Sequence, residues 1–410
     1  MPRREPIFRV VVAGAGPVGL LFAALLERQA HGRIALSIVD GRSPPPWRSD
    51  AVDARVYALS RESQHLLAAE WPWIAARRLS PYRRMRVFAG DSATGAAAVG
   101  FDAAEIGEPD LGHIVEDSLL RAALIESLEP SAVALSFGRS LAALEPSARG
   151  WRLRFDDGSQ QAADLVVGAD GADSRVRQAA GIGILRKAYA QRAIVTHVES
   201  QQAHAETAWQ RFLPDGPVAF LPLADGRSSV VWTQPLAEAE RRLALSEADF
   251  LAELTTASAG VLGGLSACAE RFAFPLELRH ATHYARAGVV LIGDAAHAVH
   301  PLAGQGVNLG LKDAAVLAGT LAAALAAGEY PGDEFVLRRY ARAQKLHNLS
   351  MQIAFDALNE LFGRRLSWLG PVRALGMAAV DSSGEAKRFL MRRALGLDRP
   401  DPAGAGHRAA

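Results

Sequence analysis

The sequence predicts an α/β protein in which strand–helix–strand units are interrupted by a strand-rich insert and followed by helices. Three observations lead to this prediction. Apolar strands that each run into a glycine turn and a helix are expected at residues 7–13 and 288–294. Between them, from about residue 184 to 280, closely spaced strands predict an antiparallel sheet. The last segment, about 334–396, has the spacing of apolar residues that is typical of helices.

Composition narrows the classes of function. The 410 residues are half hydrophobic and 22% charged, which is typical of a globular protein with a sizeable core. A net charge of +1 is too small to attract nucleic acid by overall electrostatics. The single cysteine, Cys268, excludes an intramolecular disulfide and any cysteine-based metal cluster. We therefore expect a protein of the reducing cytoplasm.

The first unit has the order of a dinucleotide-binding βαβ motif. A strand at 7–13 leads to a helix at 17–30 and a second strand at 35–40. The turn between strand and helix has a G-x-G-x-x-G spacing made by Gly14, Gly16 and Gly19. Such glycines let a pyrophosphate approach the helix N-terminus, and Asp40 at the end of the second strand is placed to accept ribose hydroxyls. This motif alone does not distinguish FAD from NAD.

The region that follows contains shorter elements. The proline-rich stretch 43–47 predicts a loop, and Asp157-Gly158 between alternating segments predicts a hairpin turn. The other expected elements are a helix from Ser60, a hairpin formed by 85–90 and 97–102, and a helix at 115–128.

Two further motifs each follow a predicted strand. In 166–177, Asp170 and the glycine after it turn the chain sharply, and Ser174, Arg175 and Arg177 bring polar groups to that turn; an ordinary strand-to-helix connection is the alternative interpretation. In 288–314, a buried strand ends at Asp294, and a glycine-rich loop then begins a long helix near Gly306. Asp294 is placed to bond a sugar-like hydroxyl, and the N–H groups of the helix favour an electron-rich partner.

The three motifs, GAGPVGL, GADGADSRVR and GDAAHAVHPLAGQGVNLG, resemble those of the class A FAD-dependent aromatic hydroxylases. The stretches DARVYALS, LGHIVEDSLLRAAL and WQRFLPDGPVAFLPL are similar to the ubiquinone-biosynthesis branch of that family. The resemblance implies a Rossmann-like FAD-binding domain of the glutathione-reductase type with an inserted antiparallel-sheet substrate domain and a C-terminal helical segment. It places on FAD the residues Gly14, Gly16, Gly19, Asp40, Arg55, Asp170, Asp294, Gly304, Gln305, Gly306, Val307 and Asn308, with Pro301 near the reactive face of the flavin.

Two positions depart from the family pattern. The branch usually has asparagine where this chain has Asp117, and the second strand often ends in glutamate rather than Asp40. The first departure lies near expected cofactor contacts, whereas the second keeps the carboxylate.

The resemblance also suggests how the chain divides. We expect an FAD-binding domain in three pieces, a substrate domain in two, C-terminal helices and a disordered tail. The boundaries are 1–80, 103–183 and 281–345 for the first, 81–102 and 184–280 for the second, 346–396 for the helices and 397–410 for the tail.

The implied activity is hydroxylation of a polyprenylated phenolic ring in ubiquinone biosynthesis, with NAD(P)H and O₂, through a C4a-hydroperoxyflavin. The chain has no second complete G-x-G-x-x-G unit, so we expect FAD to stay bound and NAD(P)H to visit. The same chemistry on a soluble aromatic or secondary metabolite is the alternative. A flavin-dependent reductase of isoprenoid double bonds and a non-catalytic flavoprotein are also open at this point.

The substrate side is less defined by the sequence. Phe220, Leu221 and Pro222 are candidates for an apolar wall over a hydrophobic aromatic substrate, and plain sheet core is an equally good interpretation. We assign no catalytic base, because His113, His197 and His204 have no pattern that places them. We assign no metal either, because His297 and His300 lie inside the third motif without a carboxylate triad.

The C-terminal segment combines leucines with basic residues, namely Arg364, Arg365, Arg373, Lys387, Arg388, Arg392 and Arg393, beside Trp368. One interpretation is an amphipathic surface that meets an anionic membrane peripherally or a partner in a biosynthetic complex. The other is a solvated helical face. The ring position hydroxylated, the choice of NADH or NADPH and any homo-oligomeric state are not decided by the sequence.

Overall fold

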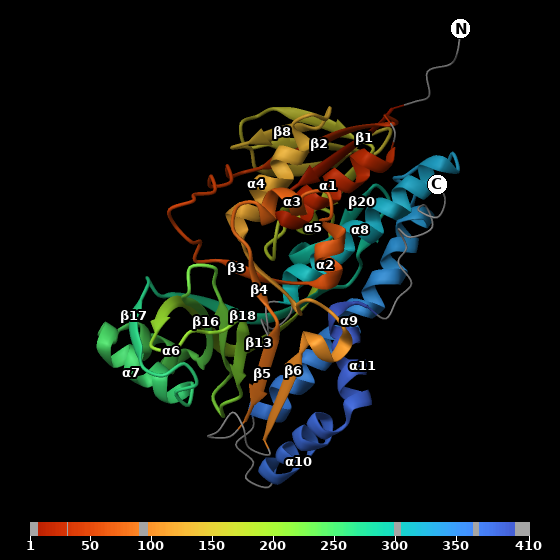
Figure 1. Ribbon diagram of the computed structural model, residues 1–410. Helices are drawn as coiled ribbons and strands as arrows, with labels where there is room; N and C mark the ends of the chain where they lie inside the picture. Colours follow the sequence, from red (N-terminus) through yellow and green to blue (C-terminus); the bar gives the residue numbers. More distant parts are fainter. Residues whose placement is uncertain (1–6, 31, 90–96, 299–304, 364–368, 398–410) are drawn as a thin grey trace.

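The computed structural model describes residues 7–30, 32–89, 97–298, 305–363 and 369–397. A sheet covered by helices forms the upper part of the molecule in Figure 1, and a second, larger sheet lies below it. The C-terminal helices run down one side and contact both parts. The fold is α/β, with mixed sheets and helices.

The upper sheet is parallel except at one edge. Its strand order is β19-β20-β12-β1-β2-β8. The bounds are β1 Phe8–Ala13, β2 Ile34–Asp40, β8 Ala134–Phe137, β12 Leu165–Gly168, β20 Val289–Leu291 and β19 Ala285–Arg286, of which only β19 is antiparallel to its neighbour. All five parallel strands therefore end at the same edge of the sheet.

Apolar helices pack around this sheet. They are α1 (Pro17–Ala30), α4 (Asp117–Leu128), α8 (Gln305–Ala326) and α9 (Glu334–Gly363). Among the described residues, α8 is the one helix whose length and composition would allow it to span a bilayer. More than half of that stretch is buried inside the protein, and α8 packs against α1 and α9, so we treat it as a core helix.

Two small antiparallel sheets and four short helices connect the larger elements. The first sheet consists of β3 (Val56–Ser60), β7 (Gly112–Glu116) and β4 (Ser80–Tyr82), and the second of β9 (Leu141–Pro146), β10 (Trp151–Phe155) and β11 (Gln160–Ala163). The short helices are α2 (Arg61–Leu66), α3 (Trp71–Ala75), α5 (Arg175–Ala179) and the 3₁₀ helix η1 (Ala103–Ile106). The hairpin expected at Asp157-Gly158 is confirmed by the β10–β11 pairing.

The helix expected from Ser60 to Trp71 is confirmed only in its first part, because α2 ends at Leu66 and residues 67–70 form turns before the separate helix α3. Pro72 has no N–H group to continue a helix, so it fits only the first turn of a new one.

The lower sheet has nine strands, ordered β21-β18-β13-β16-β15-β14-β5-β6, with β17 also paired to β13. The strands are β5 Arg84–Phe88, β6 Ala98–Asp102, β13 Ile184–Ser200, β14 Thr207–Arg211, β15 Val218–Pro222, β16 Ser228–Pro235, β17 Leu265–Cys268, β18 Phe272–Ala281 and β21 His297–Ala298. The β14–β5 pair is parallel, so the sheet is mixed rather than purely antiparallel. Helices α6 (Leu236–Leu243) and α7 (Glu247–Ala257) cover one of its faces (Figure 1).

The C-terminal helices close the edge of the lower sheet. Helix α10 (Leu369–Ser382) packs on β6, where the Gly100 N–H donates to Asp381 (3.1 Å). Helix α11 (Gly384–Leu395) lies against η1. The expected boundary between residues 345 and 346 falls inside α9, which is continuous across it.

Candidate functional site

The three motif loops meet at the carboxyl edge of the parallel sheet. Pairing brings the ends of β1, β12 and β20 together in the register Ala13, Gly168 and Leu291. The Ala169 N–H donates to the Ala13 carbonyl (2.8 Å), and the Ile292 N–H donates to the Gly168 carbonyl (3.0 Å). Each motif begins immediately after one of these strands, so the topology brings all three into one place.

The glycines of the first motif have different roles. Gly14 has a φ of +109°, and a Cβ there would lie 2.2 Å from the Ala169 carbonyl oxygen. A Cβ on Gly19 would lie 2.2 Å from the Gly14 oxygen. Both glycines are therefore required for packing. A Cβ on Gly16 would meet nothing within 4 Å, so open space remains beside the N-terminus of α1.

Asp40 connects the end of β2 to that turn. One carboxylate oxygen accepts the Ala15 N–H (2.8 Å) and the other accepts the Arg42 N–H (2.9 Å). The side chain is half-buried, and each oxygen keeps a further lone pair for a ligand hydroxyl.

Asp170 holds the start of α5 and leaves one oxygen without a partner. Its Oδ2 accepts the N–H groups of Arg175 (2.7 Å) and Val176 (3.1 Å). Its Oδ1 is buried and has no hydrogen-bond partner in the described part of the chain. Burial raises the pKa of this carboxyl, and the hydrogen bonds oppose that rise. This oxygen therefore keeps lone pairs that could accept a hydrogen bond from a hydroxyl.

Asp294 is directed outward from the third loop. It lies in the 3₁₀ turn η2 (Gly293–Ala295), and its carboxylate is open to solvent. Within the described part of the chain, no residue donates a hydrogen bond to this carboxylate.

Two arginines hold the second loop in place, one to the third loop and one to the lower sheet. Arg177 is 1% exposed and donates to the carbonyls of Ala295 (2.9 Å) and Ala172 (2.9 Å). Arg279 on β18 donates to the same Ala172 carbonyl (2.8 Å) and to Asp173 (2.7 Å). We did not predict the role of Arg279, since its strand carries no local signal for it.

The start of α8 is attached to β3 and α2 by Asn308. Its Oδ1 accepts the Ser60 N–H (3.0 Å) and the Ser63 hydroxyl (2.7 Å), and its Nδ2 donates to the Ala58 carbonyl (2.9 Å). Gly306 and Val307 lie half-buried in the first turn of α8. Gln305 begins that helix, whereas Gly304 and Pro301 lie outside the described residues.

The aspartate that departs from the family pattern has its own partners. Asp117 accepts the Tyr57 hydroxyl (2.6 Å) and pairs with Arg121 (2.9 Å). The charge of this carboxylate is therefore compensated within the protein. Arg55 interacts electrostatically with Asp117. Its guanidinium carbon lies 5.9 Å from the centre of the Phe274 ring on the lower sheet.

The face of the lower sheet that carries Phe274 has an open row of small aliphatic side chains. Val195, Val231 and Ala219 are cross-strand neighbours on β13, β16 and β15, and all three are half-buried. The two flanking rows on this face, Ala193 with Thr233 and His197 with Ser229 and Leu221, are fully buried. The three side chains therefore form a partly exposed apolar strip, which lies between Phe272 on β18 and Gln210 on β14; we call Val195, Val231 and Ala219 the aliphatic row.

The predicted substrate wall is divided between the two faces of the sheet. Phe220 packs with Trp232 and Phe250 in the core under α6 and α7, which corresponds to the sheet-core interpretation. Leu221 points to the other face and packs against Ala58 and Ile114. Pro222 is buried, and its carbonyl accepts the Ser80 hydroxyl (2.8 Å). Because side chains alternate along a strand, neighbours such as Phe220 and Leu221 cannot line one wall together.

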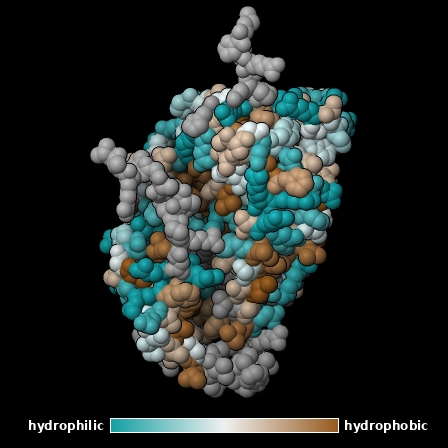
Figure 2. Space-filling view, turned by 90° about the vertical axis from the view of Figure 1, so that its right-hand side faces the viewer, coloured by the Kyte–Doolittle hydropathy of each residue, from teal (hydrophilic) through white to brown (hydrophobic). Residues whose placement is uncertain are grey.

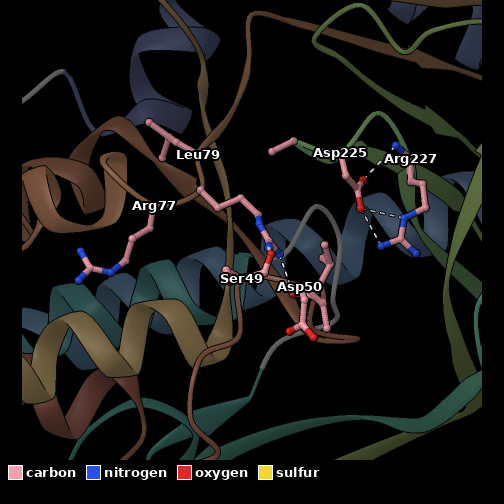
Figure 3. Close-up of a pocket in the computed structure, with 10 residues that line it drawn as sticks. Ser49, Asp50, Arg77, Leu79, Asp225 and Arg227 are labelled. Atoms are coloured by element: carbon pink, nitrogen blue, oxygen red, sulfur yellow. Dashed lines mark hydrogen bonds and ion pairs between the residues drawn. The ribbon is translucent and has the colours of Figure 1, made fainter.

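A cavity of about 420 Å³ lies between the loop at 49–52 and the turn at 224–227 (Figure 3). Its charged groups already have partners. Arg227 pairs with Asp225 (2.7 Å), and Arg78 donates to the Ala51 carbonyl (2.7 Å) and to the buried Glu116 (3.0 Å). We therefore assign no ligand to this cavity.

The structure now places the three histidines to which the sequence gave no role. Burial lowers the pKa of both His113 and His197 to about 4, so both are neutral at physiological pH. His204 Nε2 lies 3.0 Å from the Leu223 carbonyl oxygen.

Comparison with known proteins identifies a family. Residues 8–350 match the family model described as an FAD binding domain. The chain is 38% identical over 392 residues to 3-demethoxyubiquinol 3-hydroxylase of Escherichia coli (strain K12), covering 95% of this chain and 98% of that protein. It is 37% identical to ubiquinone hydroxylase UbiL of Rhodospirillum rubrum, covering 97% and 92%. It is 32% identical to the Homo sapiens mitochondrial ubiquinone biosynthesis monooxygenase COQ6, covering 94% and 92%.

Solved structures share the fold. PqsL, a probable FAD-dependent monooxygenase from Pseudomonas aeruginosa, superimposes with a TM-score of 0.74 at 22% identity, covering 90% of this chain and 99% of that one. Klebsiella pneumoniae HpxO, solved with FAD and uric acid, has a TM-score of 0.72 at 19% identity, covering 95% and 96%.

The residues at the carboxyl edge fit FAD. The space beside Gly16 and the N-terminus of α1 suits a pyrophosphate. The unpartnered Asp170 Oδ1 and the open Asp294 carboxylate suit hydroxyls of the ribityl chain or ribose.

The two glycines Gly14 and Gly16 give a test of this fit. We expect Gly14→Ala to lower the melting temperature of the FAD-free protein, because its Cβ collides with the Ala169 backbone. We expect Gly16→Ala to leave that temperature unchanged and to lower the FAD content of the purified protein, because its Cβ occupies only ligand space. Thermal melts and absorbance of released FAD measure both. Full FAD content in Gly16→Ala would contradict the placement of the pyrophosphate.

Proposed function

The chain belongs to the class A FAD-dependent aromatic hydroxylases, in the branch of the ubiquinone-biosynthesis enzymes, and we propose that it hydroxylates a polyprenylated phenolic ring in ubiquinone biosynthesis with NAD(P)H and O₂. The observation that carries this proposal is the 38% identity to 3-demethoxyubiquinol 3-hydroxylase over almost the whole of both chains. It is joined by the convergence of the three motif loops at one edge of the sheet.

FAD supplies the redox chemistry, accepting a hydride from NAD(P)H and activating O₂. In our proposal the residues of this chain hold and orient it. The α1 N-terminus beside Gly16 binds the pyrophosphate, Asp40 a ribose hydroxyl and Asp294 a ribityl hydroxyl. The N-terminus of α8, with Gly306 and Val307, favours the electron-rich end of the flavin ring.

We assign the substrate to the face of the lower sheet that carries Arg55 and Phe274. In this proposal the segments 81–102 and 184–280 form the substrate part, and the aliphatic row replaces Phe220 as the wall over the ring. Small side chains there leave width for a substituted ring, and their apolar surface excludes water from the reaction.

We also propose that a cytoplasmic enzyme meets the membrane peripherally through its C-terminal helices. Apolar and basic side chains are exposed together on α11, where Phe389 is 57% exposed beside Arg388 and Arg392. Figure 2 shows hydrophobic side chains among hydrophilic ones on the side of the molecule where the C-terminal helices lie. Lys387 does not contribute, since it is buried and pairs with Glu105 (2.8 Å). Arg364, Arg365 and Trp368 lie outside the described residues.

The proposed pathway is tested by the quinone content of a deletion strain. We expect loss of ubiquinone and accumulation of an intermediate that lacks one ring oxygen, because the missing step adds that atom. Mass spectrometry of extracted quinones measures both. Complementation with the wild-type chain should restore ubiquinone, and Asp294→Ala should not. An unchanged ubiquinone pool in the deletion strain would refute the pathway.

The aliphatic row is tested by enlarging its central member. We expect Val231→Phe to reduce substrate-stimulated NAD(P)H oxidation about tenfold or more, because the larger ring takes the space above β16 in which we place the substrate. FAD content should stay at the wild-type level. Val231→Ala, which adds no bulk at this position, is the matched control. Normal turnover of a phenolic substrate by Val231→Phe would place the ring elsewhere.

Membrane contact is tested by flotation of the full-length protein with vesicles. We expect recovery with anionic vesicles to fall when Phe389→Glu and Leu390→Glu are combined, because both apolar contacts and charge attraction are lost. Leu236→Glu, at an exposed apolar position on α6, is the control. Equal flotation of all three proteins would remove the membrane proposal.

A further inference from the structure

A buried ion pair lies directly behind the loop that carries Asp294. His297 on β21 and Asp313 on α8 have side chains that are 1% and 0% exposed, and His297 Nε2 lies 2.5 Å from Asp313 Oδ2. The two residues are sixteen positions apart and join the loop to the core helix that follows it. Neither is among the residues that the family resemblance places on FAD.

The Asp313 carboxylate also fixes the other end of the same turn. Its Oδ2 accepts the N–H of Gly293 (3.0 Å), which adopts a φ of +58° at the point where the chain leaves the sheet. Its Oδ1 accepts the side-chain amide of Asn348 on α9 (3.0 Å). The Asp313 carboxylate therefore holds Gly293, His297 and α9 together. Asp294 lies between Gly293 and His297 in the chain and is directed outward.

The surroundings of the pair are aromatic. The Tyr284 ring stacks on His297, with ring centres 5.9 Å apart, and Tyr340 is buried and donates its hydroxyl to the Leu291 carbonyl (2.9 Å). In such surroundings a carboxylate that loses its counter-charge is strongly disfavoured, because solvent cannot replace it. The positive charge on His297 therefore strengthens the contact that holds the turn.

We propose that the His297–Asp313 pair is the positioning device that holds Asp294 toward FAD, and that the charge on His297 makes FAD affinity fall in alkaline solution. The inference rests on the FAD site of the proposed function, but it does not depend on which substrate is hydroxylated.

The direction of the effect follows from the groups around His297. Burial lowers its pKa, and Asp313 and then Asp294 raise it, with the pKa above its ordinary value as the result. His280 on the neighbouring strand has its pKa lowered by burial, so it does not compete for the proton. A raised pKa in the folded state means that the pair contributes fully below pH 6.5 and is lost as the pH rises through the folded-state value.

Other charges face the same turn. Arg55 and Arg279 act on Asp294, Lys345 acts on His280, and Tyr284 and Tyr340 have pKa values raised by burial. The arginines remain charged throughout the range above pH 6.5. The test begins at pH 6.5, the ordinary pKa of histidine, because the contribution of the pair is fully present below that value.

The test measures FAD release from the purified holoprotein by the fluorescence of free flavin after dilution, from pH 6.5 to 9.5. We expect the wild-type dissociation constant to rise about tenfold or more across this range. We expect His297→Gln and Asp313→Asn each to bind FAD more weakly at pH 6.5 and to show a flat profile. Two variants are used because either one can fail to fold. If both fail, a wild-type profile without an alkaline rise is enough to overturn the proposal.

The control is His113→Asn, which removes a buried histidine whose nearest acid, Asp110, is 3.6 Å away. It should keep the wild-type slope. A wild-type slope in His297→Gln would overturn the positioning role. So would a His297→Gln protein whose melting temperature falls equally with and without FAD while its affinity for FAD is unchanged. A protein that binds no FAD at any pH would instead contradict the proposed function.

Discussion

The parallel pairing of β1 with β12 and of β12 with β20 is the constraint on which the site depends. Parallel strands end at a common edge, so three loops separated by more than a hundred residues of chain open onto one place. Gly14 makes this possible at the closest point, since the backbone at Ala169 occupies the space of a side chain. A cofactor long enough to need three loops could not be held if the strands were ordered otherwise.

Behind these loops, the protein adds buried charged groups to the apolar packing of the core. Arg177 joins the second loop to the third through two backbone carbonyls, and Asp313 holds both ends of the third. Such groups are costly to desolvate, but each fixes backbone atoms in directions that apolar contacts do not specify. The outward groups, Asp294 and one oxygen of Asp170, are thereby left free for a ligand.

The two faces of the lower sheet carry side chains of different size. The face under α6 and α7 contains the large side chains, such as Trp232 and Phe220. The opposite face carries the small aliphatic row and the Phe274 ring that approaches Arg55. Alternation along each strand therefore lets one set of strands provide both a core and the face on which we propose that the substrate lies.

The sequence by itself determined the elements whose signals are local. The strand, glycine turn, helix and acid that end at Asp40 follow one another within one unit, and spacing alone was enough to predict them. The family and its cofactor followed from three short motifs in the right order.

Only the tertiary structure decided which face each side chain of the lower sheet takes and which charges meet. The face of Phe220 depends on the register of β15, and the contact of Arg177 with Ala295 crosses 118 residues of chain. Similarly, Asp313 was visible only as an acid in an apolar helix, without any sign of His297 as its partner. Local spacing specifies helices and strands, but a contact between distant residues depends on how those elements pair and pack, which no single stretch of sequence records.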